Sequence, residues 1–313
     1  MQNVITTVVP VFALIVLGFG AGRFGFFVEG SARGLSTFVF TFAIPAMLFK
    51  AMVTLGIPAS PPWGLWGAFF TAVAIVWVLA IAASHLVAGL EGAGGSSAAL
   101  GAAFGNTVML GLPLGIAQFG AAALLPMALI ISIHLPVQWF AATLIAQWGS
   151  QNEKRDLPVL LRTLLMDLLA NPIVLALLAG TVWNLAGFGL HPIAEKFVSM
   201  LAQAAVPAAL FALGLSLARF GLMSSGLAAI MLMILKLAIM PVIAAALAFE
   251  VFDLTAVEAG IVVLFAALPT GANAYIFAER HGTAEAAVSV SVAAGTVLSI
   301  VTLSIVLALM PNI

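Results

Sequence analysis

The sequence of 313 residues contains no cysteine, and only 7% of its residues are charged. Without cysteine, neither disulfide bonds nor thiolate metal sites can form. A soluble domain has about 25% charged residues, so this chain has too few to cover a globule in water. Its net charge of −1 gives no indication of nucleic-acid binding. The chain also lacks the glycine-rich phosphate loop of ATP-hydrolysing proteins.

Apolar residues dominate instead, at 64% of the chain, with a mean hydropathy of +1.26. A helix needs about 20 apolar residues to cross a bilayer, and we interpret the first apolar run as such a span and not as a cleaved signal peptide. All spans should be helical, because an open strand in lipid leaves backbone groups unpaired. The predicted fold class is therefore all-α and integral to the membrane. The ten expected spans are 4–22, 34–55, 64–86, 96–119, 122–148, 159–186, 193–218, 224–249, 257–279 and 284–309.

The sequence repeats itself at a distance of 162 residues without any gap, and the segment 44–49 has its counterpart at 206–211. The chain is thus predicted to form one membrane unit of two five-helix repeats, 1–151 and 152–313, joined by a linker at 149–156. An odd number of spans inverts the second copy, and inverted repeats are typical of secondary transporters. Further matched pairs are Pro10 and Pro172, Gly18 and Gly180, Gly25 and Gly187, and Gly120 and Gly282.

Basic residues indicate the orientation. With the N-terminus outside, seven basic residues lie toward the cytoplasm and two, Lys50 and Lys196, toward the outside, which satisfies the positive-inside rule. We therefore expect a multi-pass protein of the inner cell membrane with both termini outside the cytoplasm. The seven are Arg23, Arg33, Lys154, Arg155, Arg162, Arg219 and Arg280.

Two spans do not resemble plain membrane helices. Residues 104–113 of span four contain two glycines, an asparagine and a proline, and residues 268–273 of span nine carry a similar set. Proline removes a backbone donor and glycine eases unwinding, so we expect each span to break near the bilayer midplane. Either segment alone could be a simple kink. Two matched breaks instead predict facing half-helix N-termini, which attract a carboxylate, with Asn106 and Asn273 adding amide donors.

These segments carry a family resemblance. Gly105-Asn106-Thr107 with Gly111-Leu112-Pro113, then Leu268-Pro269 with Asn273-Ala274 and residues 278–282, resemble the auxin efflux carrier family, which includes bacterial malonate permeases. The resemblance implies a scaffold part, a mobile part with crossed helices four and nine, and substrate beside the crossing, with Asn106, Pro113 and Pro269 in that role. The wider fold resembles the sodium–bile acid symporters. The break segments contain no Asp or Glu, which argues against sodium coupling.

The candidate substrate-binding residues cluster at the breaks, with two additions in span two. Lys50 could attract an anion from outside or could simply snorkel to the interface. No catalytic residue, metal site or cofactor is predicted. The full set of candidates is Asn106, Thr107, Gly111, Pro113, Pro269, Thr270, Gly271, Asn273, Pro45 and Lys50.

Two further polar residues lie within predicted spans. His134, in span five, could relay protons because its pKa lies near neutrality, or it could be a packing residue with satisfied hydrogen bonds. Lys236, in span eight, could belong to a structural ion pair, but the sequence does not identify its partner.

The predicted function is secondary active transport of a small organic anion, malonate or a related carboxylate, by alternating access. The expected partners are this anion, the lipid bilayer and H+ as the candidate coupling ion; whether the protein is a homodimer stays open. Alternatives are a sodium-coupled symporter of the bile acid type, an auxin-like indole carboxylate carrier, and an open channel. An intramembrane enzyme is disfavoured, because no acidic pair sits on adjacent cavity-facing turns and the histidines are scattered over different spans and loops.

Overall fold

The structure, a computed structural model, describes residues 2–28, 30–54, 62–88, 92–148, 157–218 and 226–310, and its regular elements in these ranges are all helices. Within these ranges, seven helices are long and apolar enough to cross a membrane, or eight if one bent pair counts as a single span. The prediction of an all-helical membrane protein is confirmed. The predicted linker 149–156, with the boundary between 1–151 and 152–313, lies outside the described residues.

Most of the long helices are continuous or are interrupted only by π-helical turns. These are α1 (Gln2–Arg23), α2 (Ser31–Phe38) with η1 (Val39–Ala43) and α3 (Ile44–Thr54), α4 (Trp63–Ala88), α7 (Leu124–Trp148), α10 (Pro192–Leu217), α11 (Gly226–Ile234) with η4 (Leu235–Ile239), α12 (Met240–Ala246) and η5 (Leu247–Val251), and α15 (Glu285–Leu309).

Three of the ten expected spans are divided, which is why fewer than ten helices are long enough to cross a membrane. Two divisions lie where the sequence predicts them. The third, between α8 and α9, was not predicted; it bends the chain by 60°, and Asn171 caps α9 just before Pro172. The divided segments are α5 (Ala93–Ala103), η2 (Thr107–Gly111), α6 (Leu112–Phe119) and η3 (Gly120–Ala123); α8 (Leu157–Ala170) and α9 (Pro172–Leu185); and α13 (Ala256–Ala267) and α14 (Ala272–His281).

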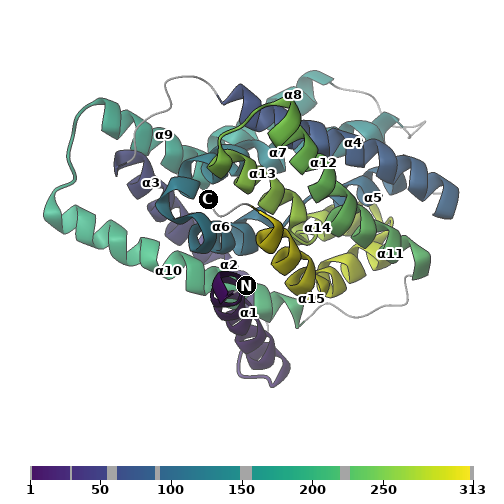
Figure 1. Cartoon of the computed structure of the whole chain (residues 1–313), viewed down its shortest axis with the longest axis horizontal. Coiled ribbons are helices and arrows are strands. Elements are labelled where there is room, and N and C mark those ends of the chain that lie inside the picture. The colour runs from purple at the N-terminus through teal and green to yellow at the C-terminus, as the bar shows by residue number, and fades with distance from the viewer. Residues whose placement is uncertain are drawn as a thin grey trace.

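The helices fall into two packed groups (Figure 1). In the first, α10 packs against α1, α2 and α3, and α3 packs against α9. The second group contains α4, α5, α7 and the helices from α11 to α15, with contacts between α4 and α5, α5 and α7, α11 and α15, and α12 and α13. The divided segments α5–α6 and α13–α14 belong to this second group.

The first group is held by close helix packing at glycines. Gly214 of α10 lies against the backbone of Ile15 in α1, and Gly18 lies against the backbone of Phe211. On the other side of the group, Gly180 of α9 lies against the backbone of Phe49 in α3. Inside a bilayer the hydrophobic effect does not drive helices together, because lipid tails are themselves apolar. Small residues let two backbones approach closely, and van der Waals packing then stabilises the contact.

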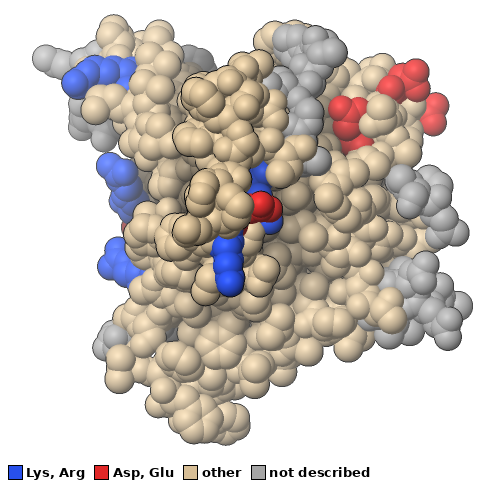
Figure 2. All heavy atoms as spheres, turned by 90° about the vertical axis from the view of Figure 1, so that its left-hand side faces the viewer, with Lys and Arg blue, Asp and Glu red and all other residues tan. Residues whose placement is uncertain are grey.

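The outer surface is apolar. Large apolar side chains such as Val16, Leu165, Val242 and Val301 are more than half exposed. Charged side chains are sparse on the face shown in Figure 2. Such a surface suits contact with lipid and not with water.

We predict that Gly214→Ala destabilises the protein, because the new Cβ would overlap the Ile15 carbonyl oxygen, which cannot move without shifting α1. Overpacking of this kind costs about 1–3 kcal/mol. The measurement is the thermal midpoint of the purified protein in detergent. Gly34→Ala is the matched control, because nothing lies within 4 Å of its Cβ position; equal midpoints for the two variants would contradict the prediction.

Candidate functional site

The first break lies between α5 and η2. The helix ends at Ala103, Phe104 is extended with φ −80° and ψ 100°, and Asn106 caps the next turn by accepting a hydrogen bond from the Met109 N–H at 3.3 Å. Gly105 permits close approach to the other break, since a Cβ there would sit 3.1 Å from the Phe265 carbonyl oxygen. An asparagine N-cap and a glycine together explain why the chain unwinds at this point.

The second break lies between α13 and α14. Leu268 is extended with φ −62° and ψ 148°, and Gly271 is extended again before α14 begins. Pro269 has no N–H to donate and disfavours the helical conformation of the residue before it. The local sequence therefore ends α13 without help from any side-chain cap.

The two breaks cross and satisfy one another. The Asn106 N–H donates to the Pro269 carbonyl at 2.9 Å, and the Gly271 N–H donates to the Phe104 carbonyl at 2.9 Å. Gly105 and Thr270 form an antiparallel bridge between them. Irregular backbone at membrane depth is tolerated only where protein or a water-filled cavity replaces lipid, and here each break supplies the partner of the other.

Two buried side chains complete the crossing. The Thr270 hydroxyl donates to the Gly101 carbonyl in the last turn of α5 at 2.7 Å and lies 3.1 Å from the Ser291 hydroxyl. Lys236 donates to the Ala266 carbonyl in the last turn of α13 at 2.5 Å. Helix C-termini leave carbonyls unpaired and carry partial negative charge, so a hydroxyl and an amine at these positions stabilise both half-helices.

This arrangement corrects the expectation that Lys236 belongs to an ion pair. Its amine is fully buried, and its neighbours in the described part of the chain are the Ala266 carbonyl and, at 3.3 Å, the Met240 sulfur. No carboxylate of a described residue pairs with it. The carbonyl end of a broken helix takes the place of the expected acidic partner.

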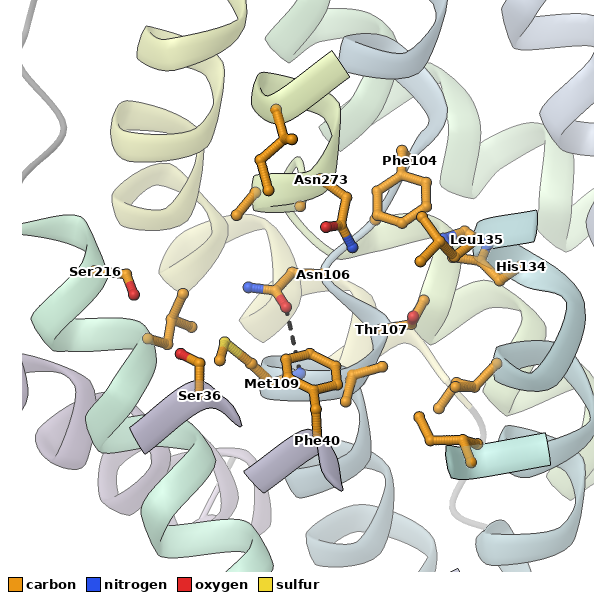
Figure 3. Close-up of a pocket in the computed structure, with 18 of the residues that line it drawn as sticks. Ser36, Phe40, Phe104, Asn106, Thr107, Met109, His134, Leu135, Ser216 and Asn273 are labelled. Carbon is orange, nitrogen blue, oxygen red and sulfur yellow. Dashed lines mark hydrogen bonds between the residues drawn. The ribbon is translucent and has the colours of Figure 1, made fainter. Parts of the chain in front are cut away.

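A cavity of about 550 Å³ lies beside the crossing, between the two groups of helices (Figure 3). This volume is typical of a small-molecule site. Among the described lining residues Arg33, which is exposed, carries charge, and none is Asp or Glu. The polar side chains of the described lining are those of Arg33, Ser36, Asn106, Thr107, His134, Asn171, Ser216 and Asn273.

The cavity is rich in hydrogen-bond donors. The backbone N–H groups of Val108, Ala272 and Asn273, in the first turns after the breaks, donate to no described residue. Asn106 and Asn273 project toward the same space from the two breaks (Figure 3). The oxygen of Asn106 is used by its cap, so its amide N–H groups are left for the cavity. Helix N-termini carry partial positive charge, which makes this end of the cavity favourable for an anion.

The structure divides the predicted site residues into four sets. Four of them, Asn106, Thr107, Gly271 and Asn273, line the cavity. Pro269 and Thr270 are buried in the crossing itself, and the hydroxyl of Thr270 is already used there.

Gly111 and Pro113 lie one or two turns beyond the first break and are buried. Gly111 packs against Leu268 and Phe265, and Pro113 occupies the first turn of α6, where its missing N–H costs nothing. Neither belongs to the described lining. Proline in this span therefore does not mark the break; glycine and asparagine do.

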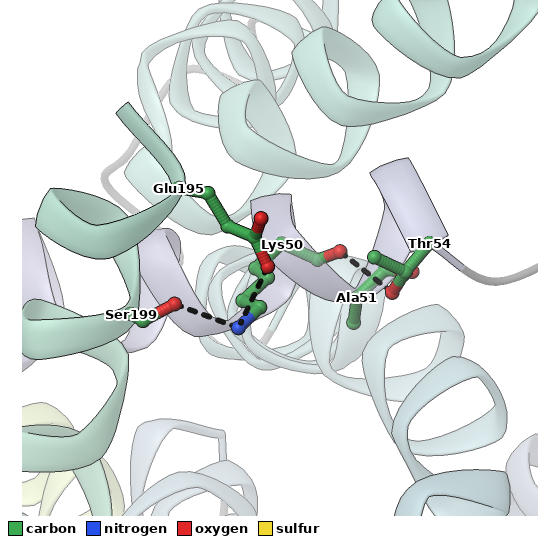
Figure 4. Close-up of polar contacts among 5 residues, drawn as sticks. All are labelled: Lys50, Ala51, Thr54, Glu195 and Ser199. Carbon is green, nitrogen blue, oxygen red and sulfur yellow. Dashed lines mark hydrogen bonds and ion pairs between the residues drawn. The ribbon is translucent and has the colours of Figure 1, made fainter. Parts of the chain in front are cut away.

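Pro45 and Lys50 of α3 are also absent from the described lining. Pro45 is buried within its helix. The Lys50 amine donates to the Ser199 hydroxyl at 2.7 Å and lies 3.8 Å from the Glu195 carboxylate of α10 (Figure 4). A partly exposed ion pair of this kind contributes little stability, and its geometry joins α3 to α10.

Sequence reasoning missed the side of the cavity that the first group of helices provides. Arg33 and Ser36 come from α2, Ser216 from α10, and Asn171 from the α8–α9 junction. The pair Asn171-Pro172 indicates the start of a helix, because asparagine caps helices and proline favours their first turn. The other three stand in ordinary helical sequence, and only the packing of α2 and α10 against the breaks identifies them.

An apolar helical bundle with a cavity at two crossed helix breaks is typical of multi-pass membrane transporters. The sequence matches the family of membrane transport proteins over residues 3–307, and the chain belongs to that family. The resemblance to the auxin efflux carriers is thereby confirmed.

Two relatives are informative. A protein of Rhizobium meliloti (strain 1021) named "Putative malonate transporter" is 27% identical over 97% of this chain and 95% of its own length. The lysosomal cholesterol signaling protein of Mus musculus is 28% identical over 66% of this chain, which corresponds to 25% of the mouse protein. The family and the first relative indicate membrane transport and not catalysis.

We predict that Thr270→Val destabilises the crossing. Valine keeps the shape but leaves the Gly101 carbonyl without its hydroxyl donor, and an unsatisfied buried polar group costs about 1–3 kcal/mol. Thermal denaturation in detergent measures the loss. Thr163→Val is the matched control, because its hydroxyl is exposed and bonds only within its own helix. A Thr270→Val midpoint equal to that of the control would refute the structural role.

Proposed function

We propose that the protein is a secondary active transporter of a small organic anion, malonate or a related carboxylate. The observation that carries this proposal is the pair of crossed helix breaks, which turn unpaired backbone N–H groups and two asparagine amides toward one cavity. A carboxylate has several acceptor sites and accepts from such donors more strongly than a neutral oxygen does. With no Asp or Glu in the described lining, nothing there repels it.

The location of the cavity supports alternating access. One wall comes from α2, α9 and α10 of the first group of helices, and the other from the breaks and α7 of the second group. A rigid-body movement of one group against the other would open the cavity to each side of the membrane in turn. The crossing travels as a unit, because its two breaks are hydrogen-bonded to each other.

Two sets of contacts support the inverted repeat of ten spans. Gly18 packs on Phe211 and Gly180 packs on Phe49, and a shift of 162 residues exchanges these two pairs. At the crossing, a shift of 165 residues relates Gly105 to Thr270 and the Gly101 carbonyl to the Ala266 carbonyl. A twofold axis through the crossing accounts for both sets, with a local offset of three residues at the crossing that a gap-free repeat of 162 residues does not include.

Malonate is the favoured substrate because the relative that spans nearly the whole chain carries malonate in its name. The bile acid and indole alternatives have no specific observation in their favour. Sodium coupling is disfavoured by the lack of acidic residues in the described lining, so H+ is the proposed coupling ion. The proposed location is the inner membrane, with both termini outside the cytoplasm.

Uptake of labelled malonate into proteoliposomes tests the proposal, with an inward proton gradient imposed and then collapsed. Uptake above that of empty liposomes that falls on collapse is the expected result. Uptake indifferent to the gradient would retain the carrier and remove proton coupling. No uptake of malonate or of a panel of other carboxylates, including indole acids, would overturn the proposed function.

We predict that Asn106→Ala and Asn106→Asp both weaken malonate binding severely. Alanine removes the amide donor and the cap, whereas aspartate keeps the cap oxygen but replaces the donor with a negative charge. If both variants lose malonate binding while Asn106→Asp remains folded, the loss reflects a missing contact to the ligand and not a missing helix cap. The measurement is the KM for uptake together with the thermal midpoint.

Asn184→Ala is the control for the Asn106 variants. It deletes an amide of the same kind that donates to the Val53 carbonyl away from the cavity. Its KM should match that of the wild type. An unchanged KM in Asn106→Asp would remove Asn106 from the binding site.

A further inference from the structure

His134 of α7 stands beside the first break. Its ring lies 4.4 Å from that of Phe104 and 5.5 Å from that of Phe69, centre to centre, and His134 belongs to the described cavity lining. Figure 3 shows the side chain next to Phe104, on the far side of the cavity from Ser36 and Ser216. The residue is 1% exposed, so each polar atom of its ring needs a partner within the protein.

A short chain of side chains fixes which ring nitrogen carries the proton. The Trp77 indole N–H can only donate, and it donates to the Gln138 carbonyl oxygen at 3.3 Å. This orients the Gln138 amide nitrogen, a donor, toward Nδ1 of His134 at 3.0 Å. Nδ1 must then be the acceptor, and the proton of a neutral imidazole lies on Nε2.

That Nε2–H group has no hydrogen-bond partner among the described residues, although it is buried. An unsatisfied buried donor is costly, and native structures rarely keep one without a role. The ring faces the Gly105 backbone at the break, but no hydrogen bond of ordinary geometry joins it to Nε2. The donor is therefore held in a fixed direction beside the cavity without a partner of good geometry.

We propose that the Nε2–H of His134 binds an oxygen of the substrate carboxylate when the cavity fills. In the present conformation the N–H is covered, so a neighbouring group, such as Phe104, whose ring contacts both His134 and the Gly271 position, must move aside for the ligand. The Trp77–Gln138 pair acts through His134 as a positioning unit that keeps Nε2 a donor. This inference rests on the proposed function, since it assumes that the ligand is a carboxylate.

The tautomer is tested on the full-length wild type with ¹⁵N-labelled histidine and NMR. The signal of His134 is identified by its loss in His134→Phe, which keeps an aromatic ring between Phe69 and Phe104. A protonated Nε2 with an unprotonated Nδ1, and a change in the Nε2 signal on adding malonate, are the expected results. A proton on Nδ1, or an Nε2 signal that malonate binding leaves unchanged, would overturn the inference.

Transport kinetics test the role. His134→Phe should raise the KM for malonate about tenfold or more, the effect of losing one hydrogen bond to a charged group, with little change in kcat. His134→Gln should recover most of the affinity, because its amide offers an N–H at a similar reach. A purely packing role predicts the reverse order, since phenylalanine resembles the imidazole ring in shape more closely than glutamine does.

Trp77→Phe adds a variant that does not touch the ligand. It frees the Gln138 amide to turn over, so we expect mixed tautomers in the NMR spectrum and a smaller rise in KM.

The failure of the proposed function and the failure of this inference can be told apart. If the wild type binds no carboxylate, the proposed function falls and this inference with it. If the wild type transports malonate and His134→Phe has the same KM, only the inference falls.

Discussion

The structure depends on two backbone hydrogen bonds exchanged between two broken helices. Asn106 donates to Pro269 and Gly271 donates to Phe104. In a bilayer an unwound segment finds no water for its backbone groups, so a single break would be costly. Each of these breaks is tolerable because the other one meets it. This requirement fixes the crossing point of α5–α6 and α13–α14, and the positions of the helices that surround them follow from it.

The crossing has two chemically different sides. Toward the helix ends that precede the breaks, the carbonyls of Gly101 and Ala266 point into the protein and are satisfied by Thr270 and Lys236. Toward the helix starts that follow, N–H groups and the amides of Asn106 and Asn273 face a cavity. The protein therefore satisfies its own acceptors and leaves donors for a ligand. A cavity with unpaired donors, which favours an anion, is the direct consequence of breaking two membrane helices in this way.

Much of this could be predicted from the sequence, because glycine, proline and asparagine act locally. They alter the backbone wherever they stand, so residue type and order alone are enough to predict a break within 104–113 and another within 268–273. Side-chain roles were less accessible. Thr270 and Lys236 serve carbonyls far away in the chain, and Lys50 pairs with Ser199 and Glu195 of α10. Which acceptor a side chain meets is decided by packing between helices, and residue type and spacing do not encode it.

The sequence by itself determined that the chain is a helical membrane protein with two matched helix breaks, because hydropathy and backbone preferences are properties of short segments. Tertiary structure alone decided that the two breaks pair with each other. It also decided that α2, α9 and α10 close the cavity with Arg33, Asn171 and Ser216, and that His134 keeps a donor without a partner of good geometry. These are relations between residues more than 100 positions apart in several cases. They arise only when the helices pack and each polar group that lipid cannot satisfy has to find its partner within the protein.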